Sequence, residues 1–180
     1  MHRPFVARCG RGVTLIEMCV VLGIVALLFG QLVPSMHRLR ERVLLRATAD
    51  ALGDDLRLAR EESVRLNRPV FFRISGKGAG ACYLLHLGSP NGCDCAGGRP
   101  QCVGPGASVI KATWLAPGQA LRLTSNIESM AFLRSRGSVS PTGSIEVRLN
   151  EREAIRVVVA ITGRVRSCYT SAPIGNLRPC

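Results

Sequence analysis

Histidine, lysine and aromatic residues are scarce in this sequence. Among 180 residues there are three histidines, two lysines (Lys77 and Lys111) and eight aromatic residues. So few histidines argue against a histidine-based metal or catalytic centre, and so few rings argue against a stacking platform for single-stranded nucleic acid. No nucleophile elbow, phosphate-binding loop or metal-binding helix is visible in the sequence. We therefore expect neither an enzyme nor a bound cofactor.

Arginine and apolar residues are abundant instead. Lys and Arg number 24 against 12 acidic residues, which gives a formal charge of +12, and 47% of the residues are apolar. This composition is too apolar for intrinsic disorder, and the length suits one folded domain.

One apolar segment near the N-terminus predicts a membrane anchor. Residues 13–33 read VTLIEMCVVLGIVALLFGQLV and contain a single ionisable side chain, Glu17. A helix of this length crosses a hydrocarbon layer of about 30 Å. The leader before it is basic, which places the N-terminus in the cytoplasm and the following domain in the periplasm. A cleaved signal peptide is the alternative, but the apolar run is long for one and 32–34 is a poor cleavage site.

The residues around this boundary carry a recognisable motif. Gly12-Val13-Thr14-Leu15-Ile16-Glu17 resembles the processing site of type IV prepilins and pseudopilins. The resemblance implies that residues 1–12 are a leader, that a prepilin peptidase cleaves after Gly12, and that the new N-terminus at Val13 is methylated. Val13 is a mild departure, since the family more often has Phe there. Glu17 and Pro34 occupy positions that the family uses in filament assembly.

Glu17 has a physical reason to be in such a segment. A carboxylate inside a membrane costs about 2.5–3.5 kcal/mol on insertion scales, and such residues usually have a partner. In a filament of packed helices it would pair with the terminal amine of a neighbouring subunit. The alternative is an acid that reaches the membrane interface or is protonated.

The segment 34–68 predicts an amphipathic continuation of the same helix. An apolar stripe recurs every three to five residues, with Arg and Glu opposite, and Arg68-Pro69 ends the pattern. We expect the C-terminal half of this stripe to pack on the following domain. Its members are Leu39, Val43, Ala47, Ala51 or Leu52, Leu56, Ala59 and Val64.

The sequence at the end of this helix resembles one branch of the pseudopilins in particular. The stretch LGDDLRLAREES (52–63), followed by Asn67-Arg68-Pro69-Val70, is similar to the GspH/FimT branch of pseudopilins. The resemblance implies a minor subunit that helps to initiate or cap a type II secretion pseudopilus or a type IV pilus. It also implies as partners other pilins or pseudopilins, the prepilin peptidase, the inner-membrane assembly platform and, before assembly, inner-membrane lipid.

After Pro69 the sequence predicts short strands, so the fold class is α+β, with a long N-terminal helix packed on an antiparallel β-sheet domain over 69–180. Gly-rich connectors are expected over 88–106 and 137–143, and an irregular tail from Cys168. The expected strands are 70–75, 82–87, 109–115, 121–125, 130–133, 144–149 and 154–161.

Six cysteines of the exported domain predict disulfides. Up to three bonds and fifteen pairings are open, and Cys93 and Cys95 are too close to bridge each other comfortably. A zinc or redox module is a less favoured alternative, because Cys93-Asp94-Cys95 has a single intervening residue and no paired CxxC is present. The six are Cys82, Cys93, Cys95, Cys102, Cys168 and Cys180.

The basic excess points to a second function. Cleavage after Gly12 removes three arginines and no acid, so the formal charge becomes +9. In a strand, Arg164 and Arg166 would point to the same side while Val165 faces the core. Gly163-Arg164-Val165-Arg166 matches the G-R-x-R pattern of FimT-like minor pilins, and this resemblance implies binding of double-stranded DNA during natural transformation.

An alternative for these arginines is that they only solvate an edge strand. Arg134 and Arg136 repeat the spacing of two residues and could extend the patch, although we do not predict them as ligands.

Overall fold

The computed structural model describes residue 12 and residues 14–76, 80–115 and 120–180, with no side-chain detail for 31–35. The chain divides into two compact units, Met1–Arg40 and Glu41–Cys180. The leader 1–11 and Val13 lie outside the described residues, as does the side chain of Pro34.

One long helix, α1 (Leu15–Arg65), runs through both units. It starts after Thr14, whose hydroxyl oxygen accepts a hydrogen bond from the Glu17 backbone N–H at 3.4 Å, as an N-cap residue does. It ends before Asn67, which has a positive φ of 49°, and Pro69 then prevents its continuation. Among the described residues, none of the helices combines the length and apolarity needed to cross a membrane.

The helical face that packs on the sheets differs from the predicted stripe. The buried face consists of Leu45, Ala49, Leu52, Leu56, Ala59 and Ser63, and Gly53 and Asp55 are buried as well. Leu52, Leu56 and Ala59 are buried as expected. Val43 and Val64 are 60% and 49% exposed and Ala47 is exposed too, so these three predictions were wrong. The predicted positions are mostly four residues apart, and each such step turns about 400°, so successive side chains drift around the helix. The observed buried positions alternate between steps of four and three residues, which keeps them on one face.

The strands that follow form two five-stranded sheets and a two-stranded hairpin. The first sheet has the order β5-β2-β1-β7-β8 and the second β12-β11-β10-β9-β6, while β3 pairs with β4. All pairings are antiparallel except β11 with β12, which is parallel. The strands are β1 (Val70–Ser75), β2 (Cys82–Leu87), β3 (Cys93–Asp94), β4 (Gln101–Cys102), β5 (Ser108–Trp114), β6 (Arg122–Ser125), β7 (Ser129–Phe132), β8 (Val139–Ser140), β9 (Gly143–Arg148), β10 (Ala154–Val159), β11 (Val165–Tyr169) and β12 (Arg178–Pro179).

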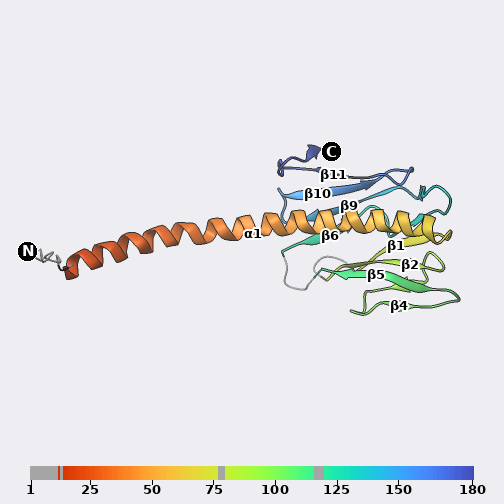
Figure 1. Cartoon of the computed structure of the whole chain (residues 1–180), viewed down its shortest axis with the longest axis horizontal. Coiled ribbons are helices and arrows are strands. Elements are labelled where there is room, and N and C mark those ends of the chain that lie inside the picture. The colour runs from red at the N-terminus through yellow and green to blue at the C-terminus, as the bar shows by residue number, and fades with distance from the viewer. Residues whose placement is uncertain (1–11, 13, 77–79, 116–119) are drawn as a thin grey trace, which may run out of the picture. The chain divides into compact units, whose positions relative to one another are not determined.

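The C-terminal half of α1 packs on both sheets, and Figure 1 shows it crossing them with β10 and β11 on one side of it in the view and β1, β2 and β5 on the other. Side chains from its buried face meet Phe72 and Leu85 of the first sheet and Ile145 and Val157 of the second in one core. The expected α+β class, a helix packed on antiparallel sheets, is confirmed.

Three expectations about irregular segments were wrong. The 88–106 connector contains the hairpin β3–β4, the 137–143 connector contains β8, and the tail expected from Cys168 is partly ordered as β11 and β12. A disulfide lies at the first and the last of these places, as described below. Strands of two residues have no periodicity that a sequence could reveal.

A polar network inside the second unit joins α1 to the first sheet. Asp55 is 3% exposed and accepts hydrogen bonds from the Tyr83 hydroxyl at 2.9 Å and from Lys111 Nζ at 2.5 Å. Burial raises the pKa of the Tyr83 phenol well above its ordinary value, which keeps it a proton donor.

Candidate functional site

The N-terminal part of α1 presents an unpartnered apolar surface. Leu15, Ile16, Leu22 and Phe29 are 83%, 72%, 65% and 61% exposed. Exposed apolar patches of this extent are typical of surfaces that interact with a membrane or with another protein. This is the segment that the sequence assigns to the membrane and the filament core.

The predicted processing residues lie at the start of this surface. Gly12 is described and exposed, and a side chain built on it would meet no atom within 4 Å. Glu17 is exposed in the first turn of α1, where a carboxylate interacts favourably with the helix dipole. Val13 and the Pro34 side chain fall outside the described residues, so the structure places only Gly12 and Glu17 of the four.

The six cysteines of the unit Glu41–Cys180 form three disulfides. They are Cys82–Cys95, Cys93–Cys102 and Cys168–Cys180. The prediction of disulfides is confirmed, and Cys93 and Cys95 have different partners as expected. A sulfur bonded in a disulfide is not the thiolate that zinc binds, and the described residues contain no group of three or more metal-ligating side chains.

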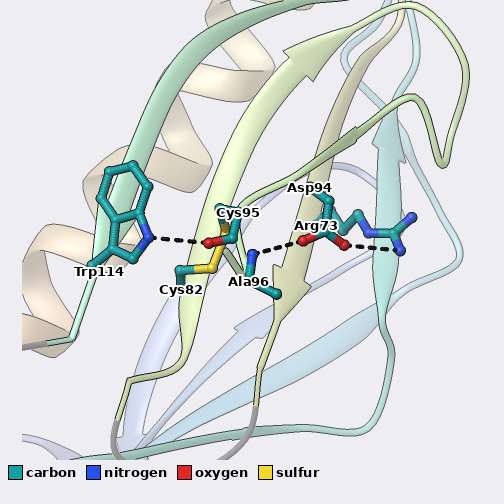
Figure 2. Close-up of a disulfide and its surroundings, with 6 residues drawn as sticks. All are labelled: Arg73, Cys82, Asp94, Cys95, Ala96 and Trp114. Carbon is teal, nitrogen blue, oxygen red and sulfur yellow. Dashed lines mark hydrogen bonds and ion pairs between the residues drawn. A yellow bond between two sulfur atoms is a disulfide. The ribbon is translucent and has the colours of Figure 1, made fainter. Parts of the chain in front are cut away.

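Two of these disulfides fix the β3–β4 hairpin over the outer face of the first sheet. Figure 2 shows Cys82 of β2 bonded to Cys95, with Trp114 donating a hydrogen bond to the Cys95 carbonyl oxygen at 3.2 Å. Beside it, Asp94 accepts a hydrogen bond from the Ala96 backbone N–H at 2.7 Å and lies 3.5 Å from an Arg73 nitrogen. This arrangement is a small second core, and its role is structural.

The second candidate surface is the turn that joins β10 to β11. Ala160 and Gly163 close the turn, since the Gly163 N–H donates to the Ala160 carbonyl at 2.8 Å and the Ala160 N–H to the Arg164 carbonyl at 3.0 Å. Arg164 and Arg166 are both exposed, while Val165 is half-buried and packs against the core. The side chains therefore alternate about the strand as the sequence analysis expected.

Gly163 is required at this turn for two reasons. Its φ is +74°, a left-handed conformation that side chains rarely adopt, and it is buried. A Cβ at this position would overlap the carbonyl oxygen of Gly137, in the turn between β7 and β8. The glycine thus allows the two turns to touch, and the Val139 N–H donates to the Ile161 carbonyl at 2.9 Å beside them.

Sequence reasoning missed one basic residue at this contact. Arg60 of α1 lies against both turns, with its Cδ 3.0 Å from where a Gly163 Cβ would be. No signal in the sequence connects Arg60 with Gly163, because 103 positions separate them. The sequence indicates only the two turns themselves, through their glycines Gly137 and Gly163.

Comparison with known proteins gives one family and a set of structural likenesses. The profile of the family described as "Type II transport protein GspH" matches residues 48–163. No curated protein sequence matches the chain.

The solved structures similar to this fold are minor pilins and a pseudopilin. The type IV minor pilin FimU of Pseudomonas aeruginosa, in one crystal form, superposes with a TM-score of 0.53 at 16% identity, covering 70% of this chain and 89% of that one. A second crystal form gives a TM-score of 0.50 at 16% identity, covering 68% and 91%. The minor pseudopilin EpsH of Vibrio cholerae has a TM-score of 0.49 at 17% identity, covering 69% and 96%. At these identities the FimU likeness establishes the fold alone, and that fold is pilin-like.

Proposed function

This chain belongs to the GspH family of type II transport proteins, and from that premise we propose that it is a minor pilin or pseudopilin subunit. It helps to initiate or cap the assembly of a type II secretion pseudopilus or a type IV pilus. The observation that carries the proposal is the exposed apolar surface of α1 with Glu17 in its first turn. The family match supports the same conclusion. It is independent evidence, because it covers residues 48–163 and does not include the apolar N-terminal part of α1.

The N-terminal motif supplies the proposed route. Before assembly the subunit is anchored in the inner membrane by residues 13–33, with residues 1–12 in the cytoplasm and the domain from residue 69 in the periplasm. Prepilin peptidase cleaves between Gly12 and Val13 and methylates Val13. The assembly platform then moves the subunit into the filament, where the apolar helix packs against the helices of other subunits.

Glu17 acts at the last step. Its carboxylate pairs with the terminal amine of a neighbouring subunit, which compensates both charges in an apolar setting and sets the register between helices. Pro34 is the second residue that we assign to assembly, at the end of the apolar segment.

The test uses the full chain in cells that assemble filaments. Glu17→Ala should leave cleavage largely intact but lower the amount of subunit in sheared filaments. The matched control is Glu41→Ala, an exposed acid on the same helix, which should be incorporated normally. Normal incorporation of Glu17→Ala would remove the register role.

A second candidate function is binding of double-stranded DNA at Gly163, Arg164 and Arg166. Arg164 and Arg166 are exposed, and neither takes part in an ion pair within the described part of the chain. Arginine binds phosphate through two parallel hydrogen bonds, so unpaired exposed arginines are suited to a DNA backbone. The Arg164→Gln/Arg166→Gln pair should weaken salt-sensitive binding in gel-shift titrations.

A further inference from the structure

Arg60 is held in place by the two turns that touch at Gly137 and Gly163. A Cβ on Gly137 would lie 2.6 Å from Arg60 Cγ, and one on Gly163 would lie 3.0 Å from Arg60 Cδ and Nε. Both glycines are buried with positive φ, at +61° and +74°. The aliphatic stem of Arg60 therefore packs on backbone at both turns, which fixes where its guanidinium emerges.

A groove of about 520 Å³ lies directly beside this contact. Arg60, Val64 and Arg65 of α1 form one wall, and Ser135 and Arg136 of the β7–β8 turn form the other. Glu61 also borders the groove but is not within ion-pair distance of any arginine in the described residues. Arg65 is paired with Glu62 at 2.6 Å, so the arginines left for a ligand here are Arg60 and Arg136.

Resting on the second candidate function above, we propose that Arg60 and Arg136 belong to the same DNA-binding surface as Arg164 and Arg166. The surface is composite: α1, the β7–β8 turn and the β10–β11 turn each contribute to it. The glycine contact between the turns positions Arg60 between the other two elements. The ligand class is the phosphate backbone of double-stranded DNA, read without base contacts.

Charge favours a polyanion over other ligands at this surface. Arg60, Arg136, Arg164 and Arg166 are exposed, and none of the four takes part in an ion pair within the described residues. Glu61 is the one acid among the residues that line the groove. Each guanidinium that contacts a phosphate releases condensed counterions, so the affinity gains a salt dependence for each contact. An acidic protein segment is the competing occupant, because Val64 and Ile161 are 49% and 67% exposed beside the arginines.

The experiment measures binding of the full-length chain in detergent to a 30-bp duplex of random sequence, 30 being about three helical turns, over a series of salt concentrations. The test variant is Arg60→Gln/Arg136→Gln. The control is Arg99→Gln/Arg152→Gln, which removes the same charge from exposed arginines that lie in the 88–106 connector and the β9–β10 connection.

The slope of log affinity against log salt is negative, and we expect the test variant to reduce its magnitude by about 1.8, at about 0.9 per lost phosphate contact. The control should leave the slope unchanged, which separates a local site from a loss of net charge. The Arg164→Gln/Arg166→Gln variant should reduce the magnitude of the slope by the same amount as the test variant.

Three results would overturn the composite surface, and they differ in what else they affect. If the wild-type chain does not bind the duplex at low salt, the DNA-binding function fails as well. If Arg164→Gln/Arg166→Gln weakens binding while Arg60→Gln/Arg136→Gln matches the control, DNA binding stands and the extension fails. If Arg60→Gln/Arg136→Gln binds DNA normally but is lost from sheared filaments, the groove is a protein interface.

Discussion

Buried polar residues at single positions determine how α1 attaches to the first sheet. Asp55 can be recognised in the sequence only as part of the DLRLAR-type helix end, because its partners Tyr83 and Lys111 lie 28 and 56 positions later. Gly12 and Glu17 could be predicted as site residues for the opposite reason, because their motif is contiguous in the sequence. Local patterns are legible in a sequence, whereas contacts between distant residues depend on the packing of the whole domain.

Asp55→Ala should destabilise the domain. It leaves the Tyr83 hydroxyl buried without an acceptor, which costs about 1–3 kcal/mol in the free energy of unfolding. The neighbouring Asp54→Ala is the control, because Asp54 is exposed and its ion pair with Arg57 should contribute less than about 1 kcal/mol. Denaturant unfolding of both variants in detergent measures the difference, and equal stabilities would contradict the role of the Asp55 network.

His86 should make stability depend on pH. It lies in β2 and is fully buried, stacks on Phe71 with ring centroids 5.4 Å apart, and its Nε2 has no partner among the described residues. Burial lowers the pKa of His86, a hydrogen bond to the Leu87 carbonyl acts in the opposite direction, and nearby Arg73 lowers it further.

Because the unfolded chain then binds the proton more readily than the folded one, stability should fall as the pH drops below about 6.5, the ordinary histidine value. Above that pH the effect is absent. His86→Phe should flatten the unfolding free energy between about pH 6.5 and pH 5. An unchanged slope in the variant would show that other groups cause the loss.

The elements differ in how far their sequences predicted them. α1 was foreseen because its apolar segment, its amphipathic pattern and its terminal Arg68-Pro69 are local signals, yet the buried face was displaced toward Leu45 and Ala49. The central strands were foreseen from their apolar runs. Strands β3, β4, β8 and β12 were missed, since strands of two residues carry no pattern of their own. β11 was not among the expected strands either.

The disulfides at these elements should contribute unequally to stability. Cys82–Cys95 and Cys168–Cys180 span 13 and 12 positions, so loop entropy alone predicts about 3 kcal/mol for each. Cys82 and Cys95 are fully buried in the second core, whereas Cys180 is exposed at the chain end. Cys82→Ala/Cys95→Ala should therefore lower the free energy of unfolding more than Cys168→Ala/Cys180→Ala, and the reverse order in denaturant titrations would contradict this account.

At the scale of the whole molecule, exposed apolar side chains and exposed arginines are concentrated in different regions of the chain. The unpartnered apolar side chains gather on the N-terminal part of α1, and the unpaired arginines at the β10–β11 turn lie in the unit Glu41–Cys180. Composition alone could not reveal this division, because an apolar content of 47% and a charge of +12 are averages over both units. The division fits a subunit that assembles through its helix and exposes its domain.

The most direct test of the account is the N-terminal peptide of the subunit recovered from sheared filaments, measured by mass spectrometry. The account predicts a chain that begins at Val13 with a methylated amine. A chain that retains residues 1–12, or one that begins beyond the apolar segment after residue 33, would contradict it.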